Sequence, residues 1–281
     1  MGRQLRVVHR TGYRYTGLVS ASHNEARMTP RATREQFVQA TRLDINPVAW
    51  THAFTDYWGT SVTAFEVAEP HQRLDVVAVS TVEVGDRLAV GPGVSWAELA
   101  DDSFADKYVE MLADSEHVDP GVELRRIAAE VAHDSARPAE AVTEIIGRIR
   151  ERVAYVPGST QVNTRAADVW AIRAGVCQDL VHLGLGALRS AGIPARYVSG
   201  YVMPSASPVV GEVRVGESHA WLQYWDGAWV GLDPTNDIAP GDFHIEVGVG
   251  RDYFDVPPLK GVYSGSESSD LFVEVEITVL G

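Results

Sequence analysis

The stretch that decides the fold of this chain lies between Gly175 and Asp237 and contains three segments: GVCQDL (175–180), ESHAWLQYWDGAW (217–229) and VGLDPTND (230–237). Cys177, in the first segment, is the only cysteine of the protein. Apolar and small residues follow it at the spacing of one helix face: Leu180, Leu183, Gly184, Ala187 and Leu188. This pattern predicts a helix that begins at Cys177 and ends near Gly192. The N–H groups and the dipole at a helix start favour the thiolate form of a cysteine.

Three side chains of this stretch have the chemistry of a cysteine nucleophile and its partners. Cys177 provides a thiol, His219 an imidazole and Asp233 a carboxylate, in that order along the chain. A thiol becomes a nucleophile when a base lies beside it, and a third group orients the base. The residues therefore predict a cysteine hydrolase or an acyltransferase.

The segment 218–234 folds back at an Asp-Gly pair (226–227), which is a strong hairpin signal. A two-residue loop would pair residues whose numbers add to 453 and would turn His219 and Asp233 to opposite faces. A three-residue loop, 225–227, gives sums of 452 and places His219 directly opposite Asp233. We predict the second register. The even-numbered residues then form an apolar face suited to burial, while His219 has Asp233 on one ring nitrogen and the thiol on the other.

Composition limits the kinds of partner and cofactor. With 281 residues, 45% of them apolar, the chain can bury a large core, and its net charge of −14 argues against nucleic acid or an anionic membrane. A single cysteine excludes internal disulfides and cysteine-rich zinc sites. We find no close set of metal ligands beyond the three residues above, so we expect no metal and no cofactor. The sequence shows no signal peptide and no membrane span, and we expect a cytoplasmic protein.

The order of the patterns predicts an α+β protein. Strands rich in β-branched residues come first (5–9, 38–45, 61–67 and 74–79), and helices follow around 124–131 and 145–153, with a short helix capped by Thr164. Residues 204–216 are predicted to be a loop near the site. We divide the chain into a β-rich, sandwich-like domain (1–92), a connector (93–120), a catalytic core (121–245) and a C-terminal segment with a closing strand (246–281).

Several segments match a known family in combination. GVCQDLVHLGLGALRSAGIPARYVSGYV, SHAW and WVGLDPTN resemble the catalytic core of bacterial transglutaminase-like proteins, a branch of the papain-like superfamily. HRTGYRYTG and ARMTPR resemble the β-rich N-terminal region that accompanies this core, and GRDYFDVPPLKGVYSG resembles the family's C-terminal end. The resemblance covers nearly the whole chain. It implies a helix for the nucleophile packed on an antiparallel sheet.

The resemblance also implies roles for individual residues. Cys177 is the implied nucleophile, His219 the general base and acid, and Asp233 the carboxylate that orients it. Such proteins transfer an acyl group through a thioester, to water in a peptidase or amidase and to an amine in a transglutaminase. We favour the hydrolase, on a peptide or protein substrate, and keep the transglutaminase and an inactive binding module as alternatives. The backbone N–H of Cys177 and the side chain of Tyr155 are the candidates for an oxyanion hole.

Three further residues have two interpretations each. Asp179 either caps the helix, which we favour, or supports catalysis directly. Trp221 and Trp229 either line a substrate groove or fill the space between the sheet and the helix. Asn236, like Asp237, is a weaker candidate than Asp233 for the third member of the triad. The sequence does not indicate the oligomeric state.

Overall fold

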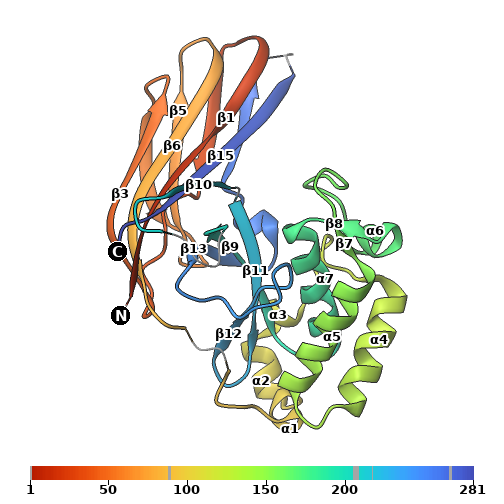
Figure 1. Cartoon of the computed structure of the whole chain (residues 1–281). Coiled ribbons are helices and arrows are strands. Elements are labelled where there is room, and N and C mark those ends of the chain that lie inside the picture. Colours follow the sequence, from red (N-terminus) through yellow and green to blue (C-terminus); the bar gives the residue numbers. More distant parts are fainter. Residues whose placement is uncertain (1, 88–89, 205–208, 217, 266–267) are drawn as a thin grey trace.

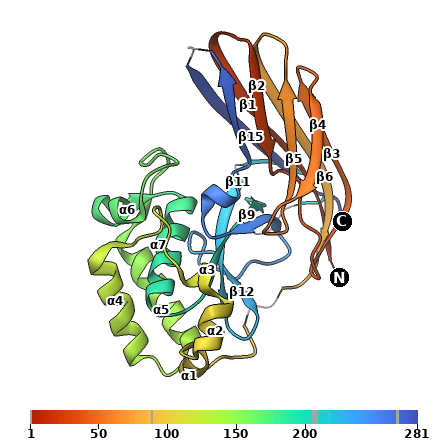
Figure 2. The same cartoon turned by 180° about the vertical axis from the view of Figure 1, so that it is seen from behind.

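The computed structural model describes residues 2–87, 90–204, 209–216, 218–265 and 268–281. A β-sandwich forms one end of the molecule, and a helical lobe with its own sheet forms the other (Figures 1 and 2). The predicted α+β class, with a β-rich N-terminal domain and a nucleophile helix packed on an antiparallel sheet, is confirmed. No helix of the described residues is long and apolar enough to cross a membrane.

The sandwich consists of two antiparallel sheets. The first has the order β10-β15-β1-β6-β3, with bounds Val213–Gly216, Ser269–Val279, Arg3–Val19, His71–Val84 and Gln36–Asn46. The second has the order β14-β2-β5-β4, with bounds Leu259–Ser264, Ala21–Ala26, Ser61–Val67 and Trp50–Thr55. The four strands predicted in this region are present. The sequence did not indicate β2, which is largely polar, or β4, which is exposed along its whole length.

The C-terminal strands complete the N-terminal sandwich. β15 pairs with β1 from Leu5 opposite Val279 onward, and β14 pairs with β2. The bounds of the four predicted domains and segments stay predictions. Residues 1–92 alone, however, do not supply all the strands of the sandwich. The prediction of a loop over 204–216 is wrong at its end, because the β-branched run beginning at Val213 forms β10 and pairs with β15. Residues 205–208 of that predicted loop lie outside the described part of the chain.

The helical lobe is built around the helix that begins at the only cysteine. Its helices are α1 to α7, with bounds Trp96–Leu99, Asp102–Lys107, Val109–Leu112, Gly121–Asp134, Pro138–Arg152, Ala166–Ile172 and Cys177–Ser190. α7 contacts α3, α4, α5 and α6 as well as three strands, so it lies at the centre of the lobe. The predicted cap at Thr164 is wrong. Arg165 is the N-cap residue of α6, and the Thr164 hydroxyl instead accepts the N–H of Gln161 at 2.9 Å.

A third antiparallel sheet lies between α7 and the sandwich (Figure 1). Its order is β12-β11-β9-β13, with bounds Trp229–Leu232, Ser218–Trp225, Ala195–Val202 and His244–Gly250. β9 and β11 contact α7, and a second apolar cluster joins Tyr201 and Ile245 of this sheet to Leu5 of β1. Two small elements complete the fold: a parallel pair of β7 (Ala154–Tyr155) with β8 (Ala174–Gly175), and a short helix η1 (Tyr253–Asp255).

The predicted register of the hairpin is wrong, because the three-residue loop begins one residue later than predicted. Trp225 pairs with Trp229 and Leu222 with Leu232, so the paired numbers add to 454 and the loop is 226–228. Trp225 stays in the strand because its N–H donates to the carbonyl of Pro194 at 2.9 Å. The buried Asp226 carboxylate accepts the N–H of Val94, which holds that residue in the loop.

The faces of the hairpin are nevertheless as predicted, because a sum of 454 has the same parity as 452. Four even-numbered residues are buried in the core that contains α7: Ala220, Leu222, Tyr224 and Val230. His219 is not directly opposite Asp233, however, because Asp233 lies just beyond the end of β12. Its contact with His219 therefore depends on the turn that follows β12.

Candidate active site

Cys177 is the first residue of α7, and its side chain is half-buried. The start of this helix is fixed by Asp179, whose carboxylate accepts the N–H of Val176 at 2.8 Å and the hydroxyl of Thr160 at 2.6 Å. Burial raises the pKa of Asp179, and these two hydrogen bonds lower it again in part. Asp179 thus caps the helix, as expected. Gly175 is required at this turn because a Cβ there would lie 2.8 Å from the Cβ of Asp179.

His219 lies between the thiol and the carboxylate. Its Nε2 is 2.7 Å from Oδ2 of Asp233, which leaves Nδ1 for the hydrogen bond that His219 makes with Cys177. Burial alone lowers the pKa of His219, but the hydrogen bonds and charges of Asp233 and Cys177 outweigh it and raise the pKa to about 9. The imidazole is therefore protonated at neutral pH. An imidazolium beside a sulfur is the arrangement in which cysteine nucleophiles are activated.

Asp233 is fully buried and is held by the turn that follows it. Its Oδ1 accepts the backbone N–H groups of Thr235 and Asn236 at 3.0 and 3.2 Å, and its own backbone pairs with Ile238. These bonds fix the carboxylate in position. They explain how Asp233 reaches His219 from beyond the end of β12.

Asn236 supports Asp233 instead of replacing it. Its side-chain amide donates to Oδ2 of Asp233 at 2.7 Å and lies 3.4 Å from Nε2 of His219. Asp237 pairs with Arg150 at 2.6 Å on the surface, so its carboxylate is engaged elsewhere. Of the three acidic or amide candidates, Asp233 makes the shortest contact with the imidazole.

A second histidine, which sequence reasoning missed, also contacts Asp233. His244 opens β13, is 2% exposed, and places its Nε2 3.3 Å from Oδ2 of Asp233. Its Nδ1 accepts the N–H of Gly241 at 3.2 Å, so the proton of the neutral ring is on Nε2 and is donated to Asp233. Only the pairing of β13 with β9 brings His244 here. The one signal in the sequence is a histidine that opens a run of alternating residues, HIEVGVG.

The hydrogen bonds to Asp233 explain its acidity. Burial alone raises the pKa of Asp233, but the bonds from His219 and His244 outweigh it and hold the pKa well below its usual range. For His244 itself, burial dominates and lowers the pKa. Asp233 is therefore ionised and His244 neutral near pH 7, while His219 carries a proton.

His219, Asp233 and His244 also form a group whose ligand atoms lie within 4.8 Å of one another. The expectation of no close ligand set beyond the triad was thus wrong, because His244 joins it. The geometry nevertheless suits a hydrogen-bond network better than a metal. The N–H of Gly241 fixes the proton of His244 on Nε2, and that atom then has no lone pair for a metal. The expectation of a metal-free site stays a prediction.

Tyr155 lies beside the start of α7. It pairs with Gly175 through β7 and β8, two residues before Cys177, and its side chain is 48% exposed. Tyr155 lines a hollow of about 400 Å³ together with Leu180 of α7 and the Pro234–Thr235 segment. The hollow thus lies next to both the helix of Cys177 and the turn of Asp233. The oxyanion role of Tyr155 stays a prediction.

The expectation for Trp221 is wrong, while the groove role of Trp229 stays a prediction. Trp221 is fully buried against Val198, Val249 and Trp58, in a cluster separate from the α7 core, so it fills the space between the sheet and the sandwich. A fully buried ring cannot line a substrate groove. Trp229 is half-buried, with the guanidinium of Arg196 4.3 Å above its ring, and it lines a different cavity.

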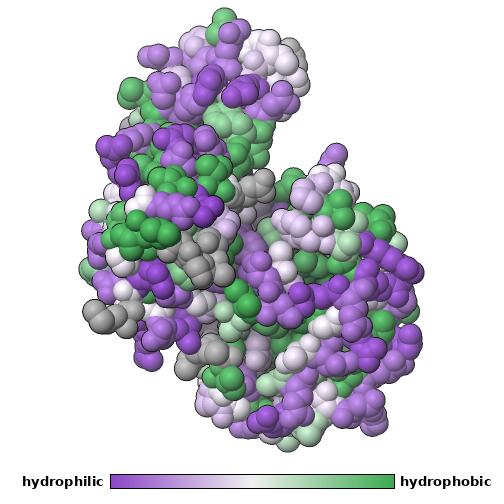
Figure 3. Space-filling view, in the orientation of Figure 1, coloured by the Kyte–Doolittle hydropathy of each residue, from purple (hydrophilic) through white to green (hydrophobic). Residues whose placement is uncertain are grey.

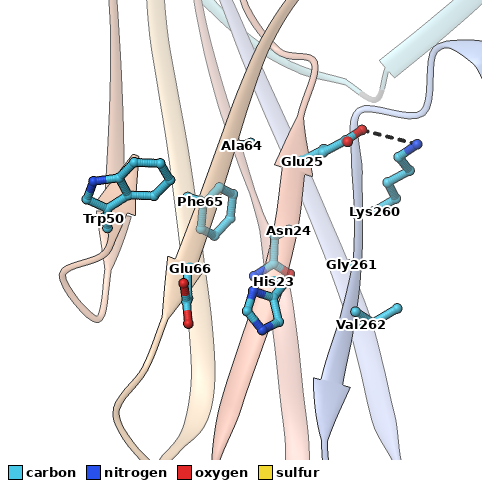
Figure 4. A pocket seen from close by; sticks show the side chains of 10 residues that line it. All are labelled: His23, Asn24, Glu25, Trp50, Ala64, Phe65, Glu66, Lys260, Gly261 and Val262. Carbon is cyan, nitrogen blue, oxygen red and sulfur yellow. Dashed lines mark ion pairs between the residues drawn. The ribbon is translucent and has the colours of Figure 1, made fainter. Parts of the chain in front are cut away.

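The sandwich carries a hollow of its own, of about 450 Å³, on the sheet β14-β2-β5-β4 (Figure 4). Trp50 stands at one side and Val262 at the other, with the ion pair between Glu25 and Lys260 at 3.1 Å. None of the candidate site residues lines it.

The surface of the helical lobe in Figure 3 is largely hydrophilic with scattered apolar patches.

Comparisons with known proteins identify the family of the chain and support its fold. Residues 5–83 match the family model "Bacterial transglutaminase-like N-terminal region", and residues 125–234 match the model "Transglutaminase-like superfamily". An uncharacterized protein of Mycobacterium leprae is 42% identical over 99% of both chains. The chain belongs to the transglutaminase-like superfamily and carries the N-terminal region of its bacterial members.

Two further relatives bear on the fold and on the core. A solved structure described as a putative cysteine protease from Cytophaga hutchinsonii superposes with a TM-score of 0.79 at 23% identity, covering 100% of this chain and 92% of that one. It confirms the fold. A protein-glutamine gamma-glutamyltransferase of Pseudomonas aeruginosa is 32% identical over 123 residues, which are 41% of this chain and 18% of that protein.

Proposed function

We propose that this protein is a cysteine-dependent amide or peptide hydrolase whose triad is Cys177, His219 and Asp233. One observation carries the proposal: the imidazole of His219 is hydrogen-bonded to the Cys177 thiol and, through Nε2, to the buried Asp233 carboxylate. A thiolate beside a protonated imidazole, with an ionised carboxylate behind the ring, is the charge arrangement that nucleophilic attack requires.

The reaction would proceed in two halves. The Cys177 thiolate attacks the amide carbonyl, and the negative charge on the oxygen is stabilised by the Cys177 N–H, with Tyr155 as the candidate second donor. The C–N bond breaks as His219 gives its proton to the leaving amine, and an acyl-thioester remains. His219 then takes a proton from water, the hydroxide adds to the thioester, and the C–S bond breaks to release the acid and the thiol.

Asp233 would act through His219. Since Asp233 is ionised and fully buried, it stabilises the imidazolium and fixes the ring so that Nδ1 faces the sulfur. The hollow lined by Tyr155, Leu180 and Thr235 lies next to the helix of Cys177 and the turn of Asp233, and it is the proposed site for a peptide or protein substrate. The cytoplasmic location of the protein stays a prediction.

Amine transfer is the second candidate. The Pseudomonas relative with 32% identity over 123 residues is by name a glutamyltransferase, and an amine could accept the same acyl-thioester in place of water. An inactive binding module is the candidate from another class. The intact set of Cys177, His219 and Asp233 supports an enzyme over this reading.

The first experiment is alkylation of the protein with iodoacetamide as a function of pH. Cys177 is the only cysteine, so incorporation of the label reports on this thiol alone. We expect wild type to react well below the pH near 8.5 at which an ordinary thiol ionises. His219→Ala should abolish this reactivity and Asp233→Ala should weaken it, while His52→Ala, on the exposed strand β4, serves as the matched control.

Equal alkylation profiles for all four proteins would contradict the triad and favour the binding module. Where the triad is supported, incubation with a peptide library in the presence and absence of a primary amine separates the two reactions. Mass spectrometry would show cleaved or deamidated peptides for a hydrolase and amine-adducted peptides for a transglutaminase.

A further inference from the structure

A cavity of about 670 Å³ lies between the sandwich and the hairpin of β11 and β12. Its lining includes Arg31 and Arg34 from the segment before β3, Arg87 from the segment after β6, and Arg196 and Trp229 from the third sheet. It shares no lining residue with the hollow beside Tyr155 and Leu180. An inference about it therefore does not depend on the proposed hydrolase activity.

The charges inside this cavity do not balance. The carboxylate of Glu246 serves two arginines, with contacts of 3.1 Å to Arg31 and 3.5 Å to Arg87, and Glu35, the other carboxylate of the lining, makes no ion pair with them within the described part of the chain. The side chains of Glu246 and Arg87 are only 5% and 11% exposed. Burying a charge is costly unless an opposite charge compensates it, so each of these guanidinium groups is only partly compensated.

Arg196 has no carboxylate partner among the described residues. Its Nε donates to the side-chain oxygen of Gln223 at 2.7 Å, and its guanidinium lies over the ring of Trp229. Burial lowers the pKa of Arg196, but only to about 10, so it remains charged at neutral pH. A half-buried cation that makes contact with only an amide and an aromatic ring leaves donors for a further partner.

Arg87 has an unused donor as well. Its two terminal nitrogens contact Glu246, Gln36 and the carbonyl of His244, while its Nε is buried and has no hydrogen-bond partner among the described residues. Buried donors are almost always paired, so Arg87, which lines the cavity, holds a donor that is not satisfied by the described residues.

We propose that this cavity binds a small organic anion through a carboxylate or phosphate group held by Arg196 and Arg87. Four arginines and two glutamates line the cavity, which leaves an excess of two positive charges in a protein whose net charge is −14. Guanidinium forks match the geometry of both oxyanions. The ring of Trp229 offers an apolar surface to the rest of the ligand.

The test is titration calorimetry of the full chain with glutarate and, separately, with phenyl phosphate, at constant ionic strength. We expect saturable binding of at least one ligand by wild type and at least a tenfold loss of affinity in Arg196→Gln. Arg148→Gln removes an exposed arginine that pairs with Glu144 on α5, and it should bind as wild type does. The ligand with the higher affinity shows whether the cavity prefers a carboxylate or a phosphate group.

A second variant keeps the test decisive if Arg196→Gln does not fold. Ala32 is exposed and lines the same cavity, so Ala32→Glu adds a negative charge at its wall without disturbing the core. We expect this variant to unfold at the temperature of wild type and to bind the anion at least tenfold more weakly. The absence of saturable binding by wild type, or wild-type affinity in both cavity variants, would overturn the proposal.

Discussion

His244 donates its Nε2 proton to Oδ2 of Asp233 across 3.3 Å, the same carboxylate oxygen that contacts His219 at 2.7 Å. The buried carboxylate therefore lies between a neutral histidine and a protonated one. His244 makes no contact with Cys177 in the hydrogen-bond network described above. Its expected role is to position and stabilise the Asp233 carboxylate.

Removal of His244 should weaken the activation of the thiol without abolishing it. His244→Ala deletes one donor to a buried charge, a loss of about 1.5–3 kcal/mol, so we expect alkylation of Cys177 at neutral pH to slow by roughly tenfold. The pKa of Asp233 should rise when it loses this donor. The acid limb of the alkylation profile should then move to higher pH.

Two variants distinguish positioning from general damage. His244→Gln retains an N–H donor and should recover part of the rate, while His23→Ala, an exposed histidine of the sandwich, should behave as wild type. A profile of His244→Ala that merely falls in amplitude, with its acid limb unmoved, would argue for a structural role alone.

The protonation of His219 links stability to pH. Its folded-state pKa of about 9 lies above the unfolded value near 6.5, so its contribution to stability is full below pH 6.5 and is lost as the pH rises through 9. The contribution is at most about 3 kcal/mol. Urea unfolding of wild type and His219→Gln at pH 6 and at pH 10 measures it: the advantage of wild type should shrink at the higher pH.

Asp233 produces the opposite dependence. Its folded-state pKa lies below the unfolded value, so its stabilisation is present above about pH 4 and is lost as the pH falls. The difference in unfolding free energy between wild type and Asp233→Asn should accordingly decrease on acidification below pH 4. A difference that stays constant from pH 6 down to pH 3 would contradict the ionised state of this carboxylate.

The cap of the nucleophile helix provides a fourth prediction. Asp179→Ala leaves the Val176 N–H and the Thr160 hydroxyl without their acceptor, and should lower the free energy of unfolding by about 1–3 kcal/mol. Asp168→Ala is the matched control, because Asp168 is an exposed acid in the first turn of α6. Equal unfolding midpoints in urea for the two variants would show that Asp179 contributes no more than a surface charge.

Local patterns predicted the parts of the site that lie on one element. The apolar spacing after Cys177 located α7, and the alternation around His219 identified the buried face of the hairpin. The exact register was not predictable, because it depends on two contacts from elsewhere: Trp225 with Pro194 and Asp226 with Val94. Both partners belong to segments that the hairpin sequence does not specify.

Long-range pairing produced the features that the sequence did not reveal. His244 reaches Asp233 because β13 lies beside β9, and the cavity with Arg87 and Arg196 exists because the sandwich packs on the third sheet. Trp221 was misplaced for the same reason, since the face away from α7 is covered by the sandwich. Spacing along one segment contains no information on which distant strand covers it.

Two glycine-to-alanine variants, one in α7 and a control in α5, test how closely α7 is packed. A Cβ on Gly186 would lie 1.9 Å from the carbonyl oxygen of Val118, so Gly186→Ala must displace backbone and should cost several kcal/mol. Gly147, in α5, has open space around its Cβ position, and Gly147→Ala should stabilise by up to about 1 kcal/mol, because alanine favours helix. Thermal unfolding of the two variants should move in opposite directions. A wild-type melting temperature for Gly186→Ala would show that α7 is not packed this closely against the segment of Val118.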